Sequence, residues 1–240
     1  MSEILNVGLF FGMGVTALLA VAIWTQARVA RRAAFINGYT WPPGLLDKLE
    51  KHHRGFTRKQ SALVSTGLRH FFLAYLNGGR KYVAMPSQVA DDLWHEFILY
   101  TKHYQEFCRK AFGGMLHHTP AVALKKGQKT DNAGLRRVWW WCCKMDHIDP
   151  KNPTRLPLLF ALDTKLNIAN GYVYEPNCEQ LRRSGSAGAQ CGGDFSSPSY
   201  DGGTDGFGDS GGDGGGSGDG GGGGDGGGDG GGGGCGGGGD

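Results

Sequence analysis

Apolar residues recur every three or four positions between Met85 and Pro120, which predicts a long amphipathic helix at the centre of the chain. Ser87 is typical of a helix start, and the Gly113-Gly114 pair is typical of a helix end. The predicted core stripe is Val89, Leu93, Phe97, Tyr100, Tyr104, Phe107 and Ala111. Polar and charged residues fall on the opposite side, so this helix is expected to present a polar face for recognition.

That polar face carries candidate metal chemistry. Asp91 and His95 stand four residues apart, close enough for the carboxylate to orient the imidazole. The same pairing supports ligands in metal sites and also stabilises ordinary helices. His117 and His118 follow the helix, and Cys108 lies near its apolar edge. These five residues are the candidate ligands for a zinc or iron ion.

Helix geometry limits how these residues can meet. On one straight helix, His95 and Phe112 would be about 26 Å apart, and six extended residues lead back over at most about 20 Å. A shared metal therefore requires the helix to break, or another segment to supply a ligand. His52, His53 and His70 precede the helix and are the candidates for completing a site with His95.

Certain residues of this stretch also form a recognisable pattern. It consists of Asp91-x-x-Trp94-His95, Leu99-Tyr100-Thr101, Tyr104, Cys108, Gly113 and Leu116-His117-His118-x-Pro120. This pattern resembles the signature of the glycine-rich domain-containing proteins, and the resemblance extends over about half of the chain and into the Gly-rich terminus. It implies no assigned biochemical activity. Many relatives carry another histidine two places after the Trp-His pair, where this chain has Phe97, and that departure weakens a metal centre carried over from the family.

The first part of the chain is strongly apolar. Ile4 to Trp24 is a run of about twenty mostly apolar residues, the length that crosses a hydrocarbon layer. It predicts a single-pass transmembrane helix, with a buried core helix or an uncleaved secretion signal as alternatives. Arg28, Arg31 and Arg32 follow the run, which predicts an N-terminus outside and a cytoplasmic body.

Small residues within this run suggest a way for two copies to approach. Gly8 and Gly12 are spaced four residues apart, a pattern that lets two membrane helices pack closely. A homodimer through these glycines is therefore an alternative to a single anchored chain.

Composition separates a basic body from an acidic tail. Of the 45 glycines in the 240 residues, 31 lie from Ser184 onward, together with nine aspartates and no lysine or arginine. The rest of the chain has 25 basic and 13 acidic residues, so it carries about +12 against −9 for the tail. The tail cannot bury enough apolar surface to offset chain entropy and is predicted to be disordered.

Further helical patterns surround the central one. They cover 44–53, 57–76, about 135–142 and 156–168, and the second begins with Thr57-x-x-Gln60, typical of a capping box. The expected fold is mainly α, with a compact bundle of about four to five helices. The predicted domains are a transmembrane anchor with a basic juxtamembrane helix at 1–36, the helical body at 40–183 and the Gly-rich tail at 184–240.

Two functions remain open. No nucleophile motif, phosphate-binding loop, Cys-x-x-Cys or His-Glu-x-x-His helix is present, which argues against the common enzyme classes. No nucleic-acid module is recognisable either. The first hypothesis is a membrane-anchored interaction module whose partner contacts Trp94 and His95. The second is a metal-binding or metal-dependent protein with its site around His95 and His117 or His118.

Overall fold

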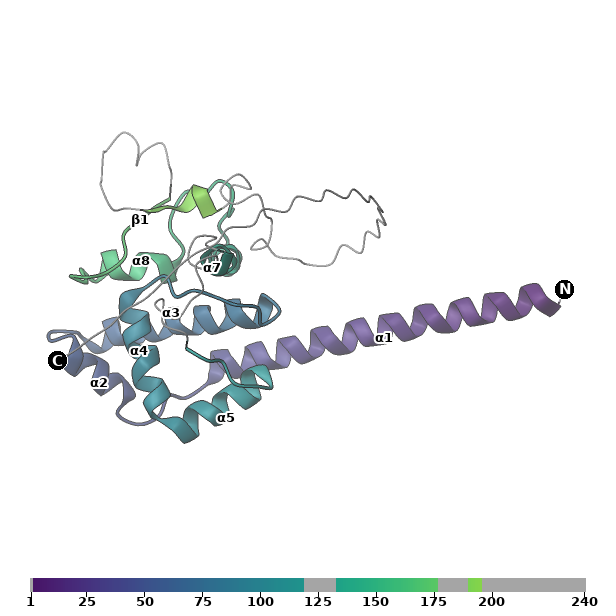
Figure 1. Cartoon of the computed structure of the whole chain (residues 1–240), viewed down its shortest axis with the longest axis horizontal. Coiled ribbons are helices and arrows are strands. Elements are labelled where there is room, and N and C mark those ends of the chain that lie inside the picture. The colour runs from purple at the N-terminus through teal and green to yellow at the C-terminus, as the bar shows by residue number, and fades with distance from the viewer. Residues whose placement is uncertain (1, 119–132, 177–189, 196–240) are drawn as a thin grey trace, which may run out of the picture. The chain divides into compact units, whose positions relative to one another are not determined.

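The computed structural model describes residues 2–118, 133–176 and 190–195, shown in colour in Figure 1. The chain divides into two units, Met1–Asp209 and Ser210–Asp240. The second unit lies outside the described residues. The prediction of a disordered tail over 184–240 also falls outside them, apart from residues 190–195.

The described part of the first unit is mainly helical, as predicted. Its α-helices are α1 (Ser2–Gly38), α2 (Leu45–His52), α3 (Arg58–Asn77), α4 (Gln88–Leu99), α5 (Thr101–Phe112), α7 (Ala133–Met145) and α8 (Leu158–Lys165). The only strands among the described residues are β1 (Tyr174–Glu175) and β2 (Gln190–Cys191). They pair in parallel and are followed by a 3-10 turn, η2 (Gly192–Phe195).

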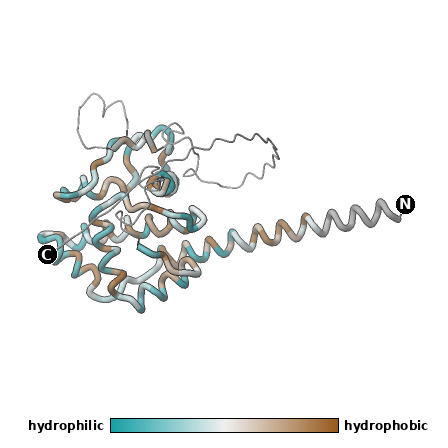
Figure 2. The backbone as a smooth tube through the Cα atoms, in the orientation of Figure 1, coloured by the Kyte–Doolittle hydropathy of each residue, from teal (hydrophilic) through white to brown (hydrophobic). Residues whose placement is uncertain are grey.

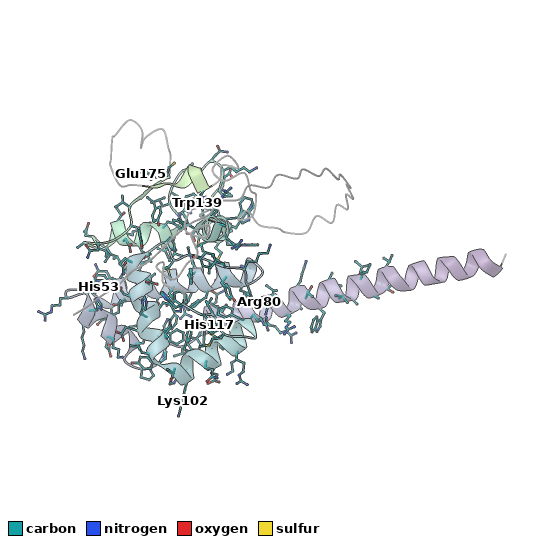
Figure 3. The ribbon with its side chains drawn as sticks, in the orientation of Figure 1. His53, Arg80, Lys102, His117, Trp139 and Glu175 are labelled. Carbon is teal, nitrogen blue, oxygen red and sulfur yellow. The ribbon has the colours of Figure 1, made fainter. Side chains whose placement is uncertain are left out.

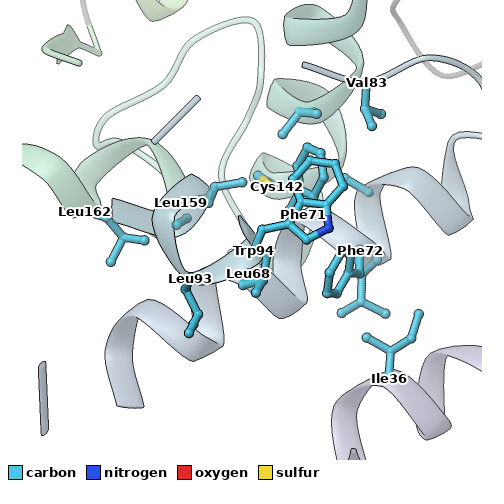
Figure 4. Packing of buried hydrophobic residues seen from close by; sticks show 14 of the residues in the cluster. Ile36, Leu68, Phe71, Phe72, Val83, Leu93, Trp94, Cys142, Leu159 and Leu162 are labelled. Atoms are coloured by element: carbon cyan, nitrogen blue, oxygen red, sulfur yellow. The ribbon is translucent and has the colours of Figure 1, made fainter. Parts of the chain in front are cut away.

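Helix α3 is the centre of the packing, because α1, α2, α4, α7 and α8 all contact it. Its N-terminus is fixed by the capping box predicted from the sequence. The Thr57 side chain accepts from the Gln60 amide, and the Gln60 side chain accepts from the Thr57 amide. Figure 4 shows how Phe71 and Phe72 of α3 lie against Trp94 of α4 in the buried interior. Burying these large rings is the main favourable contribution to the stability of such a bundle.

Helix α1 corrects the transmembrane prediction for residues 4–24. Among the described residues no helix is long and apolar enough to cross a membrane, so that part of the predicted fold class was wrong. Figure 2 shows polar residues becoming frequent toward the C-terminal part of α1.

The predicted single central helix is in fact two helices. Helix α4 ends at Leu99 and α5 begins at Thr101, and Tyr100 between them has φ −80° and ψ 59°, outside the helical region. Aromatic side chains from several segments hold this corner, including Trp41, which lies 5.2 Å from Phe97 between ring centroids. The Tyr100 hydroxyl also donates to the Pro43 carbonyl at 3.2 Å. Tertiary packing therefore overrides the continuous helical pattern of the sequence.

Candidate metal centre

The two carboxylates at the start of α4 are placed by a helix cap. Ser87 accepts from the Ala90 amide as the N-cap of α4. The first turns of the helix then carry Asp91 and Asp92 in succession. Neighbouring residues on a helix point about 100° apart, so the two carboxylates face different sides of α4. Each of them meets histidine side chains there.

Asp91 lies between two histidines. One carboxylate oxygen, Oδ1, is 3.0 Å from Nε2 of His118, and the other, Oδ2, is 3.4 Å from Nδ1 of His95. The His95 and His118 rings are 4.2 Å apart between centroids. One ligand atom from each of the three residues can be chosen such that all lie within 4.8 Å of one another. We call Asp91, His95 and His118 the Asp91 cluster.

His118 reaches this cluster because the chain turns back after α5. The break at Tyr100 reorients α5, and Gly113 ends that helix with φ 80°, a left-handed conformation that favours glycine. The Tyr104 hydroxyl then donates to the Leu116 carbonyl at 2.5 Å. The helix break that a shared site required is therefore present, and it brings His118 to α4.

Buried aromatic residues fix the position of His118. The Trp94 indole lies edge-to-face against the His118 ring, with 4.6 Å between centroids. Its Nε1 donates to the Tyr104 hydroxyl at 3.2 Å, which joins the two anchors of this segment. Burial raises the pKa of the Tyr104 phenol, so the hydroxyl stays protonated and keeps its bond to the Leu116 carbonyl.

The cluster is open to solvent on one side. The His95 side chain is 53% exposed, whereas the side chains of Asp91 and His118 are 22% and 18% exposed. Nδ1 of His95 also lies 2.9 Å from the backbone carbonyl of Asp91. When protonated, this nitrogen donates a hydrogen bond to that carbonyl, and when deprotonated it offers its lone pair to a metal ion. It cannot do both at once.

The remaining predicted site residues are not brought into the cluster. His117 is exposed and is not one of the grouped ligands. Cys108 is fully buried as a free thiol, and burial raises its pKa, which disfavours the thiolate that binds metals. Trp94, predicted to contact a partner, is only 4% exposed. His95 is the one predicted partner-binding residue whose side chain is largely exposed.

The other carboxylate, Asp92, meets His53, one of the three histidines predicted as candidates for completing a site with His95. Its Oδ2 lies 2.8 Å from Nε2 of His53, and its Oδ1 accepts from Nε2 of Gln88 at 2.9 Å. His70 lies elsewhere, 3.6 Å from Asp146. His53 and Asp92 are 39 positions apart, and no local pattern in the sequence indicates that they pair.

One protein-family model matches more than half of the chain. The protein-family model described as UCP032817-like matches residues 31–195, which include both carboxylates of α4 and the histidines that meet them. The description names no activity, cofactor or partner. No curated protein matches the chain, and no solved structure matches it.

Proposed function

The chain belongs to the UCP032817-like family, and we propose that it binds one divalent transition-metal ion through Asp91, His95 and His118. Two imidazoles and one carboxylate form the ligand set of many catalytic zinc sites and of non-haem Fe²⁺ centres. Zinc and iron are therefore the metals that this donor set suits.

The observation that carries the proposal is the return of His118 to Asp91. An i, i+4 pair such as Asp91 and His95 is common on helices and stabilises them by only about 0.2–0.5 kcal/mol. The third side chain comes from 27 positions farther along the chain and is held by buried aromatic groups. A metal site requires such a third ligand to converge on the pair, whereas an ordinary helix pair does not.

Three protein ligands give such a site an open position. Structural zinc sites are closed by four protein ligands, whereas catalytic sites keep one position for water or a substrate. The exposed side of His95 is where an exogenous ligand would reach an ion. We infer a metal-binding domain whose ion has a coordination position open to exchangeable ligands such as water. This differs from a purely structural zinc site.

His118 and His117 provide a matched pair of variants. Zn²⁺ binding to the tag-free full-length chain is measured by isothermal titration calorimetry for the wild type, His118→Ala and His117→Ala. Losing a residue that only supports a ligand costs about 10–100-fold in metal affinity. Losing His118 itself should cost at least as much, while His117→Ala, which removes an adjacent exposed imidazole outside the cluster, should bind within about twofold of the wild type.

Thermal unfolding gives a second readout. Zn²⁺ at about 100 times its Kd should stabilise the wild type by about 2.7 kcal/mol, the value for an ion that binds only the folded state. His118→Ala should lose this increment from the Asp91 cluster. Equal Zn²⁺ affinities and equal stabilisation of the two variants would refute a site at these residues. The stabilisation by Zn²⁺ is taken for each variant as the difference between measurements with and without the ion. This difference is free of the stability that His118→Ala loses in the metal-free protein with the His118–Asp91 contact.

A further inference from the structure

We propose that His52, His53 and Asp92 form a second divalent-metal site on the other side of helix α4. One ligand atom from each can be chosen such that all three lie within 4.8 Å of one another. We call these residues the Asp92 cluster. It shares no ligand with the Asp91 cluster, so either site can be removed by substitution without removing a ligand of the other.

The Asp92 cluster is built from two separate elements. His52 is the last residue of α2, and His53 is its C-cap, whose amide donates to the Leu49 carbonyl at 2.9 Å. Asp92 comes from α4. The side chains of His53 and Asp92 are only 17% and 15% exposed, and His52 is exposed at the rim. A partly buried pair with one exposed ligand leaves a path for an ion from solvent.

Neighbouring side chains hold the two partly buried ligands, His53 and Asp92, in place. Gln88 donates to Oδ1 of Asp92 at 2.9 Å, which leaves Oδ2 directed at His53. The Phe56 ring stacks on His53 with 4.9 Å between centroids. Hydrogen bonds of this kind to a ligating carboxylate orient ligands in metal sites.

The second histidine distinguishes this cluster from an ordinary ion pair. A bond between His53 and Asp92 is sufficient to tie α2 to α4. His52 adds nothing to that bond, yet its ring stacks on His53 with 5.0 Å between centroids and an interplanar angle of 23°. This packing holds a second imidazole nitrogen beside the carboxylate, and imidazole and carboxylate together suit zinc.

Two neighbouring carboxylates therefore serve two different sites. Asp91 and Asp92 differ by one helical step of about 100°, so one ion cannot use both with the histidines of both clusters. In Figure 3, His53 lies by α2 and His117, which precedes His118, lies on the other side of α4. The chain is therefore expected to bind two ions, one on each side of this helix.

Counting bound ions tests the second site separately from the first. Equilibrium dialysis of the tag-free full-length chain against Zn²⁺, followed by metal analysis, should give two ions per chain. His53→Ala and His118→Ala should each give one, and the double variant should give none. His103→Ala, an exposed histidine of α5 outside both clusters, should still give two.

His52→Ala protects the test from a folding defect. It leaves the bond between His53 and Asp92 intact and removes only the exposed third ligand. The second Zn²⁺ should then bind about tenfold or more weakly, since even supporting residues contribute that much. Circular dichroism of each variant should match the wild type.

The pattern of retained and lost ions separates the two sites. One ion in the wild type that is lost in His118→Ala and kept in His53→Ala would overturn the second site and leave the Asp91 cluster in place. One ion that is lost in His53→Ala and kept in His118→Ala would support the second site and overturn the first. Two ions that persist in both His53→Ala and His52→Ala would also overturn the Asp92 site.

Discussion

The buried carboxylate of Asp163 accepts a hydrogen bond from the Ser87 hydroxyl at 2.7 Å, which ties α8 to the start of α4. Asp163 is only 2% exposed. It also accepts from the backbone amides of Gln88 at 2.7 Å, Val89 at 3.2 Å and Tyr172 at 2.9 Å. Two of these amides lie in the first turn of α4, where a negative charge also interacts favourably with the helix dipole. Asp163 therefore positions the helix that carries both clusters.

Asp163→Asn should destabilise the protein strongly. The amide keeps the shape but loses the charge, and its NH₂ group turns a donor toward groups that are all donors. Hydrogen bonds to charged groups contribute about 1.5–3 kcal/mol each, so we expect the free energy of unfolding to fall by at least that amount. Urea denaturation measures the loss. Ser87→Ala keeps the carboxylate but removes one of its donors and the N-cap acceptor of the Ala90 amide. It should cost less than Asp163→Asn, because three donors to the carboxylate remain, and equal losses for the two variants would contradict this role.

Tyr104→Phe should loosen the segment that carries His118. The change removes the acceptor of Trp94 and the donor to the Leu116 carbonyl inside the core, and leaving buried polar groups unpaired costs about 1–3 kcal/mol. Zn²⁺ affinity at the Asp91 cluster should fall although all three ligands remain. Calorimetric titration and urea denaturation measure the two effects. Tyr172→Phe, at an exposed ring, is the control, and unchanged Zn²⁺ affinity in Tyr104→Phe would separate Tyr104 from the site.

Gly113 and Gly114 offer a comparison of adjacent glycines. Gly113→Ala forces a side chain into the left-handed region, which costs about 1–2 kcal/mol, and the new methyl group would also meet the Arg32 guanidinium. Gly114 has no neighbour within 4 Å of an added methyl group. Gly114→Ala should therefore change the free energy of unfolding by far less in urea denaturation. A similar loss in both variants would argue against the helix end described at Gly113.

His70 makes stability depend on pH. Burial lowers the pKa of its imidazole, an effect that Asp146 partly opposes. The unfolded chain then binds more protons than the folded protein, so the free energy of unfolding falls as pH drops through about 6.5. His70→Asn should flatten this slope between about pH 7 and pH 5 in urea denaturation with chelator present. His103→Asn, an exposed residue, should keep the wild-type slope, and an unchanged slope in His70→Asn would contradict the burial argument.

Local sequence patterns predicted much of the framework. The Thr57–Gln60 capping box is present as predicted, because it depends on residues three positions apart. Helix α4 starts after Ser87 and α5 ends before Gly113, as the start and end signals indicated. These features are local, and their physical causes lie within one helical turn.

The break at Tyr100 could not be predicted in this way. No glycine or proline interrupts residues 88–112, so a continuous helix is the expectation from the pattern. The corner is held by Trp41 packed on Phe97 and by the bond from Tyr100 to Pro43, whose partners lie more than fifty positions earlier. The pairing of His53 with Asp92 escaped prediction for the same reason, since it exists only once α2 is packed on α4. The ligand types were recognisable in the sequence, whereas their grouping depends on tertiary structure.

The contact between His118 and Asp91 closes a stretch of 27 positions that contains all of α5. An ion bound to both residues would act as a reversible cross-link, because it removes conformations that the unfolded chain otherwise samples. Helix α5 would then gain less conformational freedom on leaving the bundle, because its two flanking segments would stay joined. Metal supply would thereby set how readily this helical corner opens while the rest of the domain stays folded.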